Sequence, residues 1–353
     1  MPERKLASIQ TISELNPIEG ADRIECATVL GWKVVVGKGE FNVGDKVVYL
    51  EIDSVVPDKP EFAVLKSRGF RVKTCRLRKQ ISQGICFSTS ILPPESPADI
   101  GKDVTEQLGV IKYEPYVPAQ LVGKIKGAFP SWLHKTDEIR IQSVPKVLER
   151  HRDKKFWVTE KMDGTSMTVY LNAMEHGGEF GVCSRNLDLK EEGETAYWKY
   201  ARESRLEETM RAISARGDLG LLNFALQGEL IGPGIQGNRY GLDEVEFRVF
   251  NVYDVMKGAY VDLNVIQRTP ETSFFYEFLE EWGLMQVPIV ATGYTLPSTV
   301  DALVEYSKAK SVLNPMIWRE GVVVRSQQEA YDEELHRLSF KVLNPEYLIK
   351  FEG

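Results

Sequence analysis

The sequence has no hydrophobic run long enough to cross a bilayer, and its longest apolar runs, such as residues 34–36 and 322–324, are strand-length. The first residues, Met-Pro-Glu-Arg, lack the apolar core of a signal peptide. No membrane association is therefore expected, and a cytoplasmic location follows by default. The four cysteines contain no Cys-x-x-Cys pair, and the four histidines show no ligand spacing with them. Neither disulfides nor a structural zinc site is predicted.

The chain also lacks an excess of positive charge, because 44 Lys and Arg against 51 Asp and Glu give a formal net charge of -7. This balance argues against a protein that coats nucleic acid over its whole surface, although it allows a local basic groove. Internal repeats and low-complexity tracts are absent as well. With 353 residues, 43% hydrophobic and 27% charged, the composition is typical of a folded protein with two domains.

Residues 1–115 contain short strand-like runs separated by Gly, Pro, Asn and Asp turns, which is typical of a small β-barrel. The segment 66–79 holds seven basic residues and no acidic one. If residues 71–78 form a strand, its basic side chains share faces in two pairs, Arg71 with Lys73 and Arg76 with Arg78. These four side chains are a candidate nucleic-acid surface. An edge strand that uses Lys and Arg to prevent aggregation explains the pattern equally well.

Residues 116–132 have the prolines and glycines of a linker, so a domain boundary is predicted there. A larger second domain, residues 133–353, follows. Strand patterns dominate it. Apolar residues spaced three or four apart predict helices at three places, residues 195–216, 272–282 and 299–310.

The second domain contains the run Glu160-Lys161-Met162-Asp163-Gly164 between two strand-like segments. Taken alone, Lys-x-Asp-Gly is weak evidence, because a simple turn between strands explains it. Further short runs follow in order: Ser184-Arg185-Asn186, Gly228-Glu229-Leu230, Phe247-Arg-Val-Phe250, Glu320-Gly321-Val322 and Phe340-Lys341-Val342. In this order and at these spacings, the series resembles the motifs of the covalent nucleotidyltransferase superfamily, which comprises DNA ligases, RNA ligases and mRNA-capping guanylyltransferases.

The resemblance makes Lys161 the nucleophile that attacks the α-phosphorus of a nucleotide. Its amine must lose a proton, although the pKa of a free lysine is about 10.4. Mg²⁺ or Mn²⁺ near the amine would lower that pKa and neutralise the α-phosphate, and carboxylates are needed to hold the metal or its waters. The resemblance assigns this metal site to Asp163, Glu229 and Glu320. Considered singly, each of the three would more often be a surface carboxylate.

The resemblance also implies an ATP site that includes Glu160 and Gly164. Phe250 would stack on the purine, unless it belongs to the core. Arg185 would contact the ribose or a phosphate, with a surface salt bridge as the alternative. Lys341 would hold the α-phosphate.

Two further basic positions belong to the expected ATP site. The family often has a second lysine two residues from the last one, but positions 339 and 343 hold Ser and Leu, which leaves Lys350 as a substitute. Arg140 lies 21 residues before Lys161 and would grip the β- or γ-phosphate. A structural salt bridge from Arg140 to Asp137 or Glu138 is the alternative.

Domain order selects among the subfamilies. Capping enzymes and large DNA ligases carry a β-barrel after the nucleotidyltransferase domain, whereas here the β-rich module comes first and twelve residues follow Lys341. This order resembles the RNA ligase 5 type, and the runs 136–142 and 228–236 resemble segments of RNA ligase catalytic domains. The fold class implied is α+β, with an N-terminal OB-fold barrel followed by a larger nucleotidyltransferase (ATP-grasp-like ligase) domain of antiparallel sheets with flanking helices.

The implied function is an ATP-dependent RNA ligase that seals 3′-OH and 5′-phosphate ends, with nicks in duplexes as the expected substrate, through AMP bound to Lys161. Its partner would be RNA or an RNA-containing nicked duplex. Two alternatives remain at this point. One is an ATP-dependent DNA-nick ligase, and the other is a nucleic-acid-binding protein that has kept the fold without catalysis.

Overall fold

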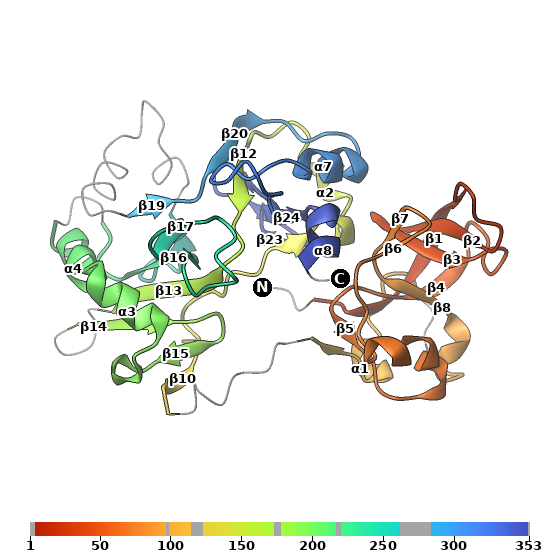
Figure 1. Ribbon diagram of the computed structural model, residues 1–353, viewed down its shortest axis with the longest axis horizontal. Coiled ribbons are helices and arrows are strands. Elements are labelled where there is room, and N and C mark those ends of the chain that lie inside the picture. Colours follow the sequence, from red (N-terminus) through yellow and green to blue (C-terminus); the bar gives the residue numbers. More distant parts are fainter. Residues whose placement is uncertain are drawn as a thin grey trace.

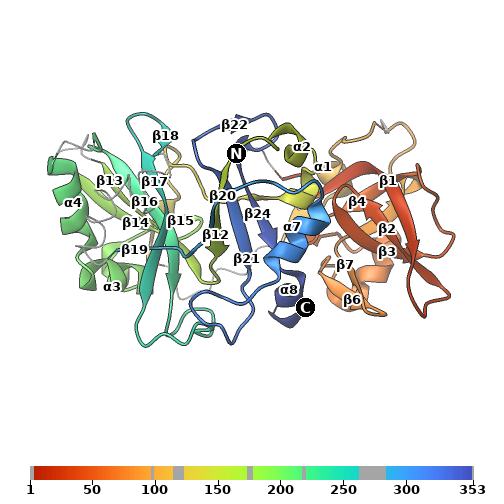
Figure 2. The same cartoon turned by 90° about the horizontal axis from the view of Figure 1, so that it is seen from above.

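The computed structural model describes residues 4–96, 99–113, 123–172, 178–216, 220–261 and 284–351. Two sheets of a larger domain and one N-terminal barrel lie side by side (Figure 2). Among these residues, no helix is long and apolar enough to cross a membrane.

The barrel is built on an antiparallel sheet of five strands in the order β3-β2-β1-β4-β8. Buried and partly exposed residues alternate along β3, which is the pattern of a strand with one face toward a core. The backbone N–H of Gln83 donates to the carbonyl of Lys33 and draws the two edges of the sheet together. The strands are β1 (Ala7–Pro17), β2 (Ile24–Val29), β3 (Trp32–Gly37), β4 (Lys46–Leu50) and β8 (Ile85–Ser88).

Short elements decorate the barrel. They are β5 (Ser54–Val55), which pairs with β9 (Ile111–Lys112), the hairpin of β6 (Cys75–Leu77) and β7 (Gln80–Ser82), the helix α1 (Thr105–Leu108) and the 3₁₀ turns Pro60–Arg68 and Thr89–Ile91. The predicted strand over residues 71–78 is wrong in extent. Only β6 forms, because Arg78 and Lys79 both adopt positive φ and make the two-residue turn of the hairpin.

The first sheet of the larger domain carries a pair of helices (Figure 1). In sheet order its strands are β10 (Ile125–Ala128), β15 (Leu187–Leu189), β14 (Glu179–Cys183), β13 (Thr165–Asn172), β16 (Phe224–Ile231), β17 (Glu246–Asp254) and β18 (Ala259–Tyr260), while β19 (Met285–Gln286) also pairs with β17. The helices are α3 (Ala196–Glu203) and α4 (Leu206–Arg216).

The second sheet adjoins the barrel. In sheet order its strands are β11 (Ile139–Arg140), β24 (Ser339–Leu343), β21 (Gly321–Ser326), β12 (Phe156–Lys161) and β20 (Ile289–Tyr294). Every residue of β21 is buried, as expected for a central strand covered on both faces. Around it lie the hairpin β22 (Tyr331–Asp332) and β23 (His336–Arg337), the 3₁₀ turn Ile141–Ser143, and the helices α2 (Val147–Arg150), α7 (Val300–Ser307) and α8 (Pro345–Phe351). The 3₁₀ turn Glu191–Gly193 follows β15 of the first sheet.

Two of the three helices predicted in the second domain fall on described residues. The predicted helix 195–216 is present but broken into α3 and α4, because Arg205 between them has a φ of 54°. The predicted helix 299–310 is present as α7 but ends early, at Ser307; Thr299 caps its start by accepting a hydrogen bond from the Ala302 N–H. The predicted helix 272–282 lies outside the described residues.

The predicted linker, residues 116–132, is described only from residue 123 onward. Within it, β10 is not a free connection, because it pairs with β15 and extends the first sheet. The domain limits of 1–115 and 133–353 remain predictions.

The barrel is packed against the second sheet rather than tethered to it. Leu343 at the end of β24 and Leu348 in α8 belong to the buried cluster that forms the barrel core. The N–H of Gly31 donates to the carbonyl of Gln142, and Lys33 pairs with Asp301 at 3.3 Å. Figure 1 shows α8, in dark blue, at this junction. The barrel and the catalytic sheets therefore share a core and can position one another's residues.

Candidate active site

Lys161 ends β12, the strand between β20 and β21. The register pairs Lys161 with Gly321, which brings Glu320, just before β21, next to the lysine. The Lys161 Nζ lies 2.7 Å from Glu320 Oε1, and the lysine side chain is 26% exposed. A partly buried amine with one carboxylate partner is therefore reachable by a ligand from one side.

Glu229 approaches the same lysine from the other sheet. It lies on β16, whose pairing with β13 sets Glu229 opposite Ser166. The turn from β12 to β13 passes very close to β16. A Cβ on Gly164 would lie 2.3 Å from the Leu230 carbonyl oxygen and 2.6 Å from Ile231 Cγ2. Glycine at this position therefore allows the two sheets to meet at the lysine.

We expect Gly164→Ala to lower the rate of Lys161 modification roughly 100-fold, because a displacement of about 1 Å at a reacting group has an effect of that size. The turn must move away from β16 to admit the methyl group, and Lys161 moves with it. Rate measurement together with thermal unfolding checks this. Gly127→Ala is the control, since a Cβ there meets nothing within 4 Å. A Gly164→Ala protein with a normal rate would show that the close approach is unimportant.

The charges around Lys161 keep it protonated. Burial alone would lower the lysine pKa, but Glu320 and Glu229 outweigh it and the pKa is raised. Burial raises the pKa of Glu229 to about 7, with Glu320 adding to the effect and Lys161 opposing it. A nucleophilic amine at this site requires that the negative charge of the two carboxylates be neutralised.

A second cluster centres on Asp137. Lys341 from β24 donates to it at 2.9 Å, Arg185 at 2.9 Å and Lys112 of the barrel at 3.0 Å. Although burial would raise it, the pKa of Asp137 is held well below its usual value, chiefly by Lys341 and Arg185. Burial lowers the pKa of Lys341 to about 8, with Asp137 opposing. The predicted phosphate-binding cations Arg185 and Lys341 are thus brought together around one carboxylate.

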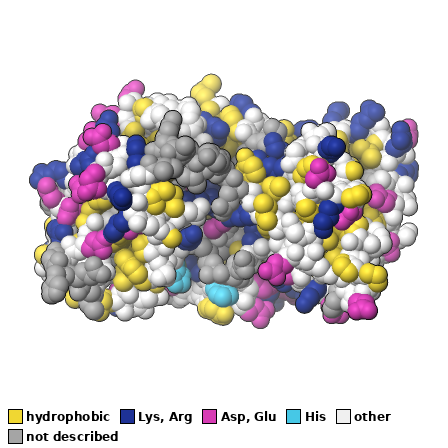
Figure 3. All heavy atoms as spheres, turned by 90° about the horizontal axis from the view of Figure 1, so that it is seen from below, with side chains coloured by type: hydrophobic (Ala, Val, Ile, Leu, Met, Phe, Trp, Pro, Cys, Tyr) yellow, Lys and Arg dark blue, Asp and Glu magenta, His cyan; other side chains and the backbone are white. Residues whose placement is uncertain are grey.

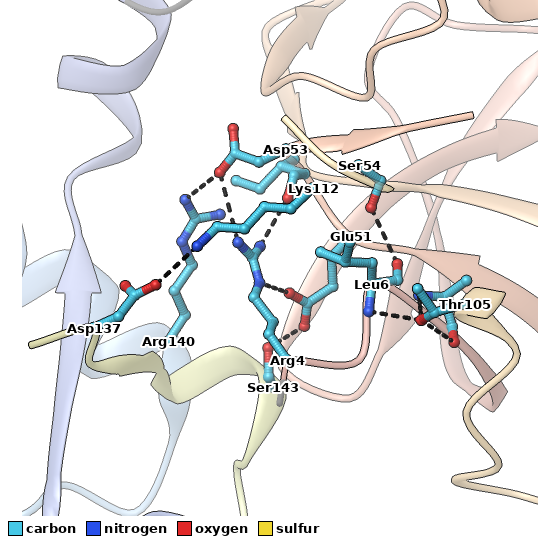
Figure 4. Close-up of polar contacts among 12 residues, drawn as sticks. Arg4, Leu6, Glu51, Asp53, Ser54, Thr105, Lys112, Asp137, Arg140 and Ser143 are labelled. Carbon is cyan, nitrogen blue, oxygen red and sulfur yellow. Dashed lines mark hydrogen bonds and ion pairs between the residues drawn. The ribbon is translucent and has the colours of Figure 1, made fainter. Parts of the chain in front are cut away.

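Arg140 lies beside this cluster on β11, in parallel register with Lys341. It is 8% exposed and donates from Nη2 to Asp53 of the barrel at 2.8 Å (Figure 4). Its Nε and Nη1 are buried without a partner among the described residues. The alternative salt bridge to Asp137 or Glu138 is wrong, because the carboxylate that binds Arg140 comes from the barrel instead. The two unpartnered donors suit the predicted contact with a phosphate.

Asp53 joins the barrel to this part of the site. It accepts from Arg71 and Arg140 and lies 3.8 Å from Arg4, whose guanidinium also binds Glu51 (Figure 4). Burial opposes ionisation, but Arg140, Arg4 and Arg71 together lower the pKa of Asp53 to about 2.

Asp163 does not join Glu229 and Glu320. Its Oδ2 contacts Arg239 and the hydroxyl of Tyr347, and its N–H donates to the hydroxyl of Tyr240 at 2.7 Å. Among the residues that the structure describes, no three His, Cys, Asp or Glu side chains form a group that could hold a metal ion. The predicted metal trio is therefore not assembled, because its third member pairs with an arginine instead.

Glu229 and Glu320 nevertheless fit a divalent cation. Two carboxylates face Lys161 from opposite sheets, and burial raises the pKa of one of them. Mg²⁺ commonly binds one or two carboxylates together with substrate phosphates and keeps several waters, so a full protein cage is not required.

Two further residues predicted for the ATP site, Phe250 and Glu160, lie in different surroundings. Phe250 is half-buried on β17 and packs against Met162, Ile231 and Tyr240. Glu160 is buried, and its Oε2 accepts from the Val312 N–H at 2.7 Å. Its Oε1 has no partner among the described residues, and burial raises its pKa. Both placements allow the predicted contacts with a nucleotide, and neither tests them.

The predicted nucleic-acid surface divides into two kinds of residue. Arg71 binds Asp53 and stacks on the ring of Tyr113 at 3.6 Å, while Arg76 binds Glu346 of α8 through both carboxylate oxygens. Within the described chain, Lys73 and Arg78 have neither a hydrogen bond nor an ion pair. Figure 3 shows basic and acidic side chains interspersed on one face of the molecule, so a basic surface would have to be local.

Several site residues escaped prediction from the sequence. No sequence pattern indicates Lys112, Arg239 or Tyr347, and the sequence suggests Asp137 only as an alternative salt-bridge partner of Arg140. Lys341 and Asp137 lie 204 residues apart, and Asp163 and Tyr347 lie 184 apart. No local pattern links such pairs, so only the fold could reveal them.

The strand-end lysine, its two carboxylates and the adjoining cations are the side chains that the nucleotidyltransferase resemblance predicts for one site. The family model described as RNA ligase matches residues 154–343, and one described as an OB-fold domain matches residues 6–89. The chain belongs to the RNA ligase family. The OB-fold prediction for the barrel and the α+β class are confirmed.

Solved structures of Naegleria gruberi RNA ligase are similar to the whole chain. A mutant with AMP and Mn is 36% identical, with a TM-score of 0.83 and 99% of both chains covered. A mutant with ATP and Mn is 36% identical, with a TM-score of 0.82 and 99% coverage of both. The same ligase with pyrophosphate is 37% identical, with a TM-score of 0.82 and the same coverage. Among curated proteins, no sequence matches the chain.

Proposed function

We propose that the protein is an ATP-dependent RNA ligase that joins a 3′-OH to a 5′-phosphate at nicks in duplexes, with AMP carried on Lys161. The observation that carries this is the placement of Lys161 against Glu320, with Glu229 beside it and the cations Lys341 and Arg185 of the Asp137 cluster nearby. The Naegleria gruberi RNA ligase, solved with ATP, AMP, pyrophosphate and Mn, supports the choice of nucleotide and metal.

In the first step, the Lys161 amine attacks the α-phosphorus of ATP. The N–P bond forms, the bond from phosphorus to the bridging oxygen breaks, and pyrophosphate leaves. Glu320 Oε1, 2.7 Å from Nζ, would orient the amine before the attack. A divalent cation held by Glu229 and Glu320 would lower the pKa of Lys161 and neutralise charge on the α-phosphate.

The cations then bind the phosphates. Lys341 and Arg185 bind Asp137, and phosphate oxygens would compete with that carboxylate for the same donors. Arg140 offers Nε and Nη1 to the β- or γ-phosphate while Asp53 retains Nη2. This arrangement orients pyrophosphate as the leaving group.

Two further transfers complete the reaction. The 5′-phosphate of the RNA attacks the phosphorus of the lysyl-AMP, which frees Lys161 and forms a 5′-5′ pyrophosphate linkage. The 3′-OH then attacks the activated 5′-phosphate, and AMP leaves. Phosphate contacts from the barrel would hold the strand without sequence preference.

We expect Lys73→Ala/Arg78→Ala to weaken binding of a nicked RNA duplex several-fold and to flatten its salt dependence, since each lost phosphate contact lowers the slope by about one unit. Neither residue has a partner within the described chain, so stability and lysine adenylylation should not change. Binding isotherms at several salt concentrations measure this. Arg71→Ala is the contrasting variant, because Asp53 holds Arg71 and its loss should lower stability. Unchanged affinity in the double variant would exclude this surface.

The specificity part of the proposal is tested with matched nicked duplexes that differ in the sugar at the 3′-OH end. A terminal ribose should be sealed and a terminal deoxyribose sealed poorly, and unpaired ends should react more slowly than nicks. Equal sealing of the deoxyribose end would make the protein a general nick ligase. Faster joining of unpaired ends would contradict the duplex preference.

A further inference from the structure

The carboxylate of Asp163 is held in a way that none of the nucleotidyltransferase motifs accounts for. Asp163 lies in the turn between β12 and β13, two residues after the nucleophile. Its Oδ2 contacts both Arg239 and the Tyr347 hydroxyl, and Arg239 also contacts that hydroxyl. Among the described residues, none bonds Oδ1. One oxygen is therefore fixed and the other is left for a ligand.

The two residues that hold Oδ2 come from distant parts of the chain. Arg239 lies between β16 and β17, and its guanidinium lies 4.1 Å from the centroid of the Phe351 ring. The backbone carbonyls of Arg239 and Tyr240 both accept from Asn314. Tyr240 also accepts the N–H of Asp163 at 2.7 Å. The segment 239–240 thus fixes both the backbone and the side chain of Asp163.

Tyr347 comes from α8, the helix that follows the strand of Lys341. It is 2% exposed, and its ring packs on Phe351 with centroids 4.7 Å apart. Within this buried setting, the phenol reaches the carboxylate of Asp163, which does not form a group with Glu229 and Glu320. A buried hydroxyl that meets a carboxylate forms a charge-assisted hydrogen bond, which restricts the carboxylate more than packing alone does.

The start of α8 is anchored to the site from another direction. Asn344 is fully buried, and its N–H donates to the carbonyl of Glu320 at 2.8 Å. Its side-chain oxygen accepts from the Glu346 N–H, and its amide donates to the carbonyl of Arg319. On the other face, Leu348 enters the barrel core. The helix therefore has little freedom to move Tyr347 away from Asp163.

From this geometry we infer that Tyr347 and Arg239 are positioning residues for Asp163, and that α8 is thereby part of the adenylylation site. The inference rests on the proposed function. Both residues contact Asp163 directly, and their part in the reaction is exerted through its carboxylate. By holding Oδ2, they leave Oδ1 free to contact the nucleotide in a single orientation. The turn between β12 and β13 then does not need to rearrange when the transition state forms.

The test is a double-mutant cycle on the full-length protein, read by the single-turnover rate of Lys161 adenylylation over a range of ATP concentrations. Tyr347→Phe removes only the hydroxyl and keeps the ring against Phe351. We expect its maximal rate to fall roughly 10- to 100-fold, the effect of one hydrogen bond to a charged group, with the KM for ATP within about twofold of wild type. Arg239→Gln should behave in the same way.

The cycle partner is Asp163→Asn. If Tyr347 acts through Asp163, adding Tyr347→Phe to Asp163→Asn should cause no further loss, because the carboxylate it positions is already gone. If the rate losses of Tyr347→Phe and Asp163→Asn multiply in the double variant, the inference is overturned. A Tyr347→Phe protein with the wild-type rate would also overturn it. Tyr294→Phe is the matched control, since it removes a hydroxyl from β20 that has no hydrogen bond within the described chain.

The outcomes separate the inference from the function on which it rests. A wild-type protein that forms no adduct with ATP would overturn the proposed function and the inference together. A wild-type protein that forms the adduct, with Tyr347→Phe equally active, would overturn the inference alone. Thermal unfolding of each variant shows whether a rate loss has a structural origin. If the rate loss of Tyr347→Phe is only proportional to its loss of folded protein, the hydroxyl stabilises the fold and does nothing else. That result would overturn the inference as well.

Discussion

Lys341→Ala should reduce the rate of Lys161 adenylylation roughly 100-fold, the effect of removing one preorganised donor from a developing charge. Lys341 is the least exposed of the three cations that bind Asp137, and burial lowers its pKa to about 8. In the Lys341→Ala variant, phosphate oxygens that approach the cluster would no longer have this cation as a partner. Rates of adduct formation at saturating ATP, compared between wild type and variant, measure the effect.

Lys350→Ala is the control for Lys341→Ala, because Lys350 was the predicted substitute for the missing second lysine. It is exposed on α8, and its ammonium lies 5.0 Å from the centroid of the Phe351 ring. We therefore expect its variant to react at the wild-type rate. A large loss with Lys350→Ala and a small one with Lys341→Ala would reverse the assignment of the phosphate-binding lysine.

Asp53→Asn should lower the free energy of unfolding by about 2 kcal/mol at pH 7, the value of a carboxyl pKa lowered from 3.8 to about 2. Because the folded protein binds this proton more weakly than the unfolded chain, the stabilisation is complete above pH 3.8. It disappears as the pH falls toward 2. Denaturant unfolding at several pH values should show the two proteins converging in acid.

Asp53→Asn should also slow the adenylylation of Lys161 by ATP, since Arg140 would lose the carboxylate that fixes its Nη2. Asp58→Asn is the matched control, because Asp58 is exposed five residues further along the barrel and has neither a hydrogen bond nor an ion pair among the described residues. A pH-independent stability difference for Asp53→Asn, or an equal one for Asp58→Asn, would show that the three arginines do not depend on Asp53.

The sequence allowed better prediction of which motif residues lie together than of the residues elsewhere in the chain that bind them. Lys161 and Glu320 lie in short runs with fixed spacing, and the strand register brings them within 2.7 Å. Asp163 belongs to the same run, yet the fold turns it toward Arg239. A motif specifies residue types in order, whereas the pairing of charges depends on which segments the fold brings together.

Local backbone geometry explains the errors in secondary structure. The basic run 71–78 alternates as a strand should, but a hairpin turn at Arg78 and Lys79 ends β6 early. Turns of this kind usually contain Gly or Asn, so no residue type in the run signals one. Arg205 breaks the predicted helix 195–216 for a similar reason, since its positive φ is not typical of arginine.

The central claim is that Lys161 carries AMP, and α-labelled ATP tests it most directly. The pure protein is incubated with Mg²⁺ or Mn²⁺ and labelled ATP or GTP, and then denatured and separated by electrophoresis, with Lys161→Ala as the control. Mass spectrometry of the untreated protein first excludes AMP that is already bound. We predict label from ATP that survives denaturation and is absent from Lys161→Ala. No retained label with either metal, or equal label on Lys161→Ala, would contradict the account.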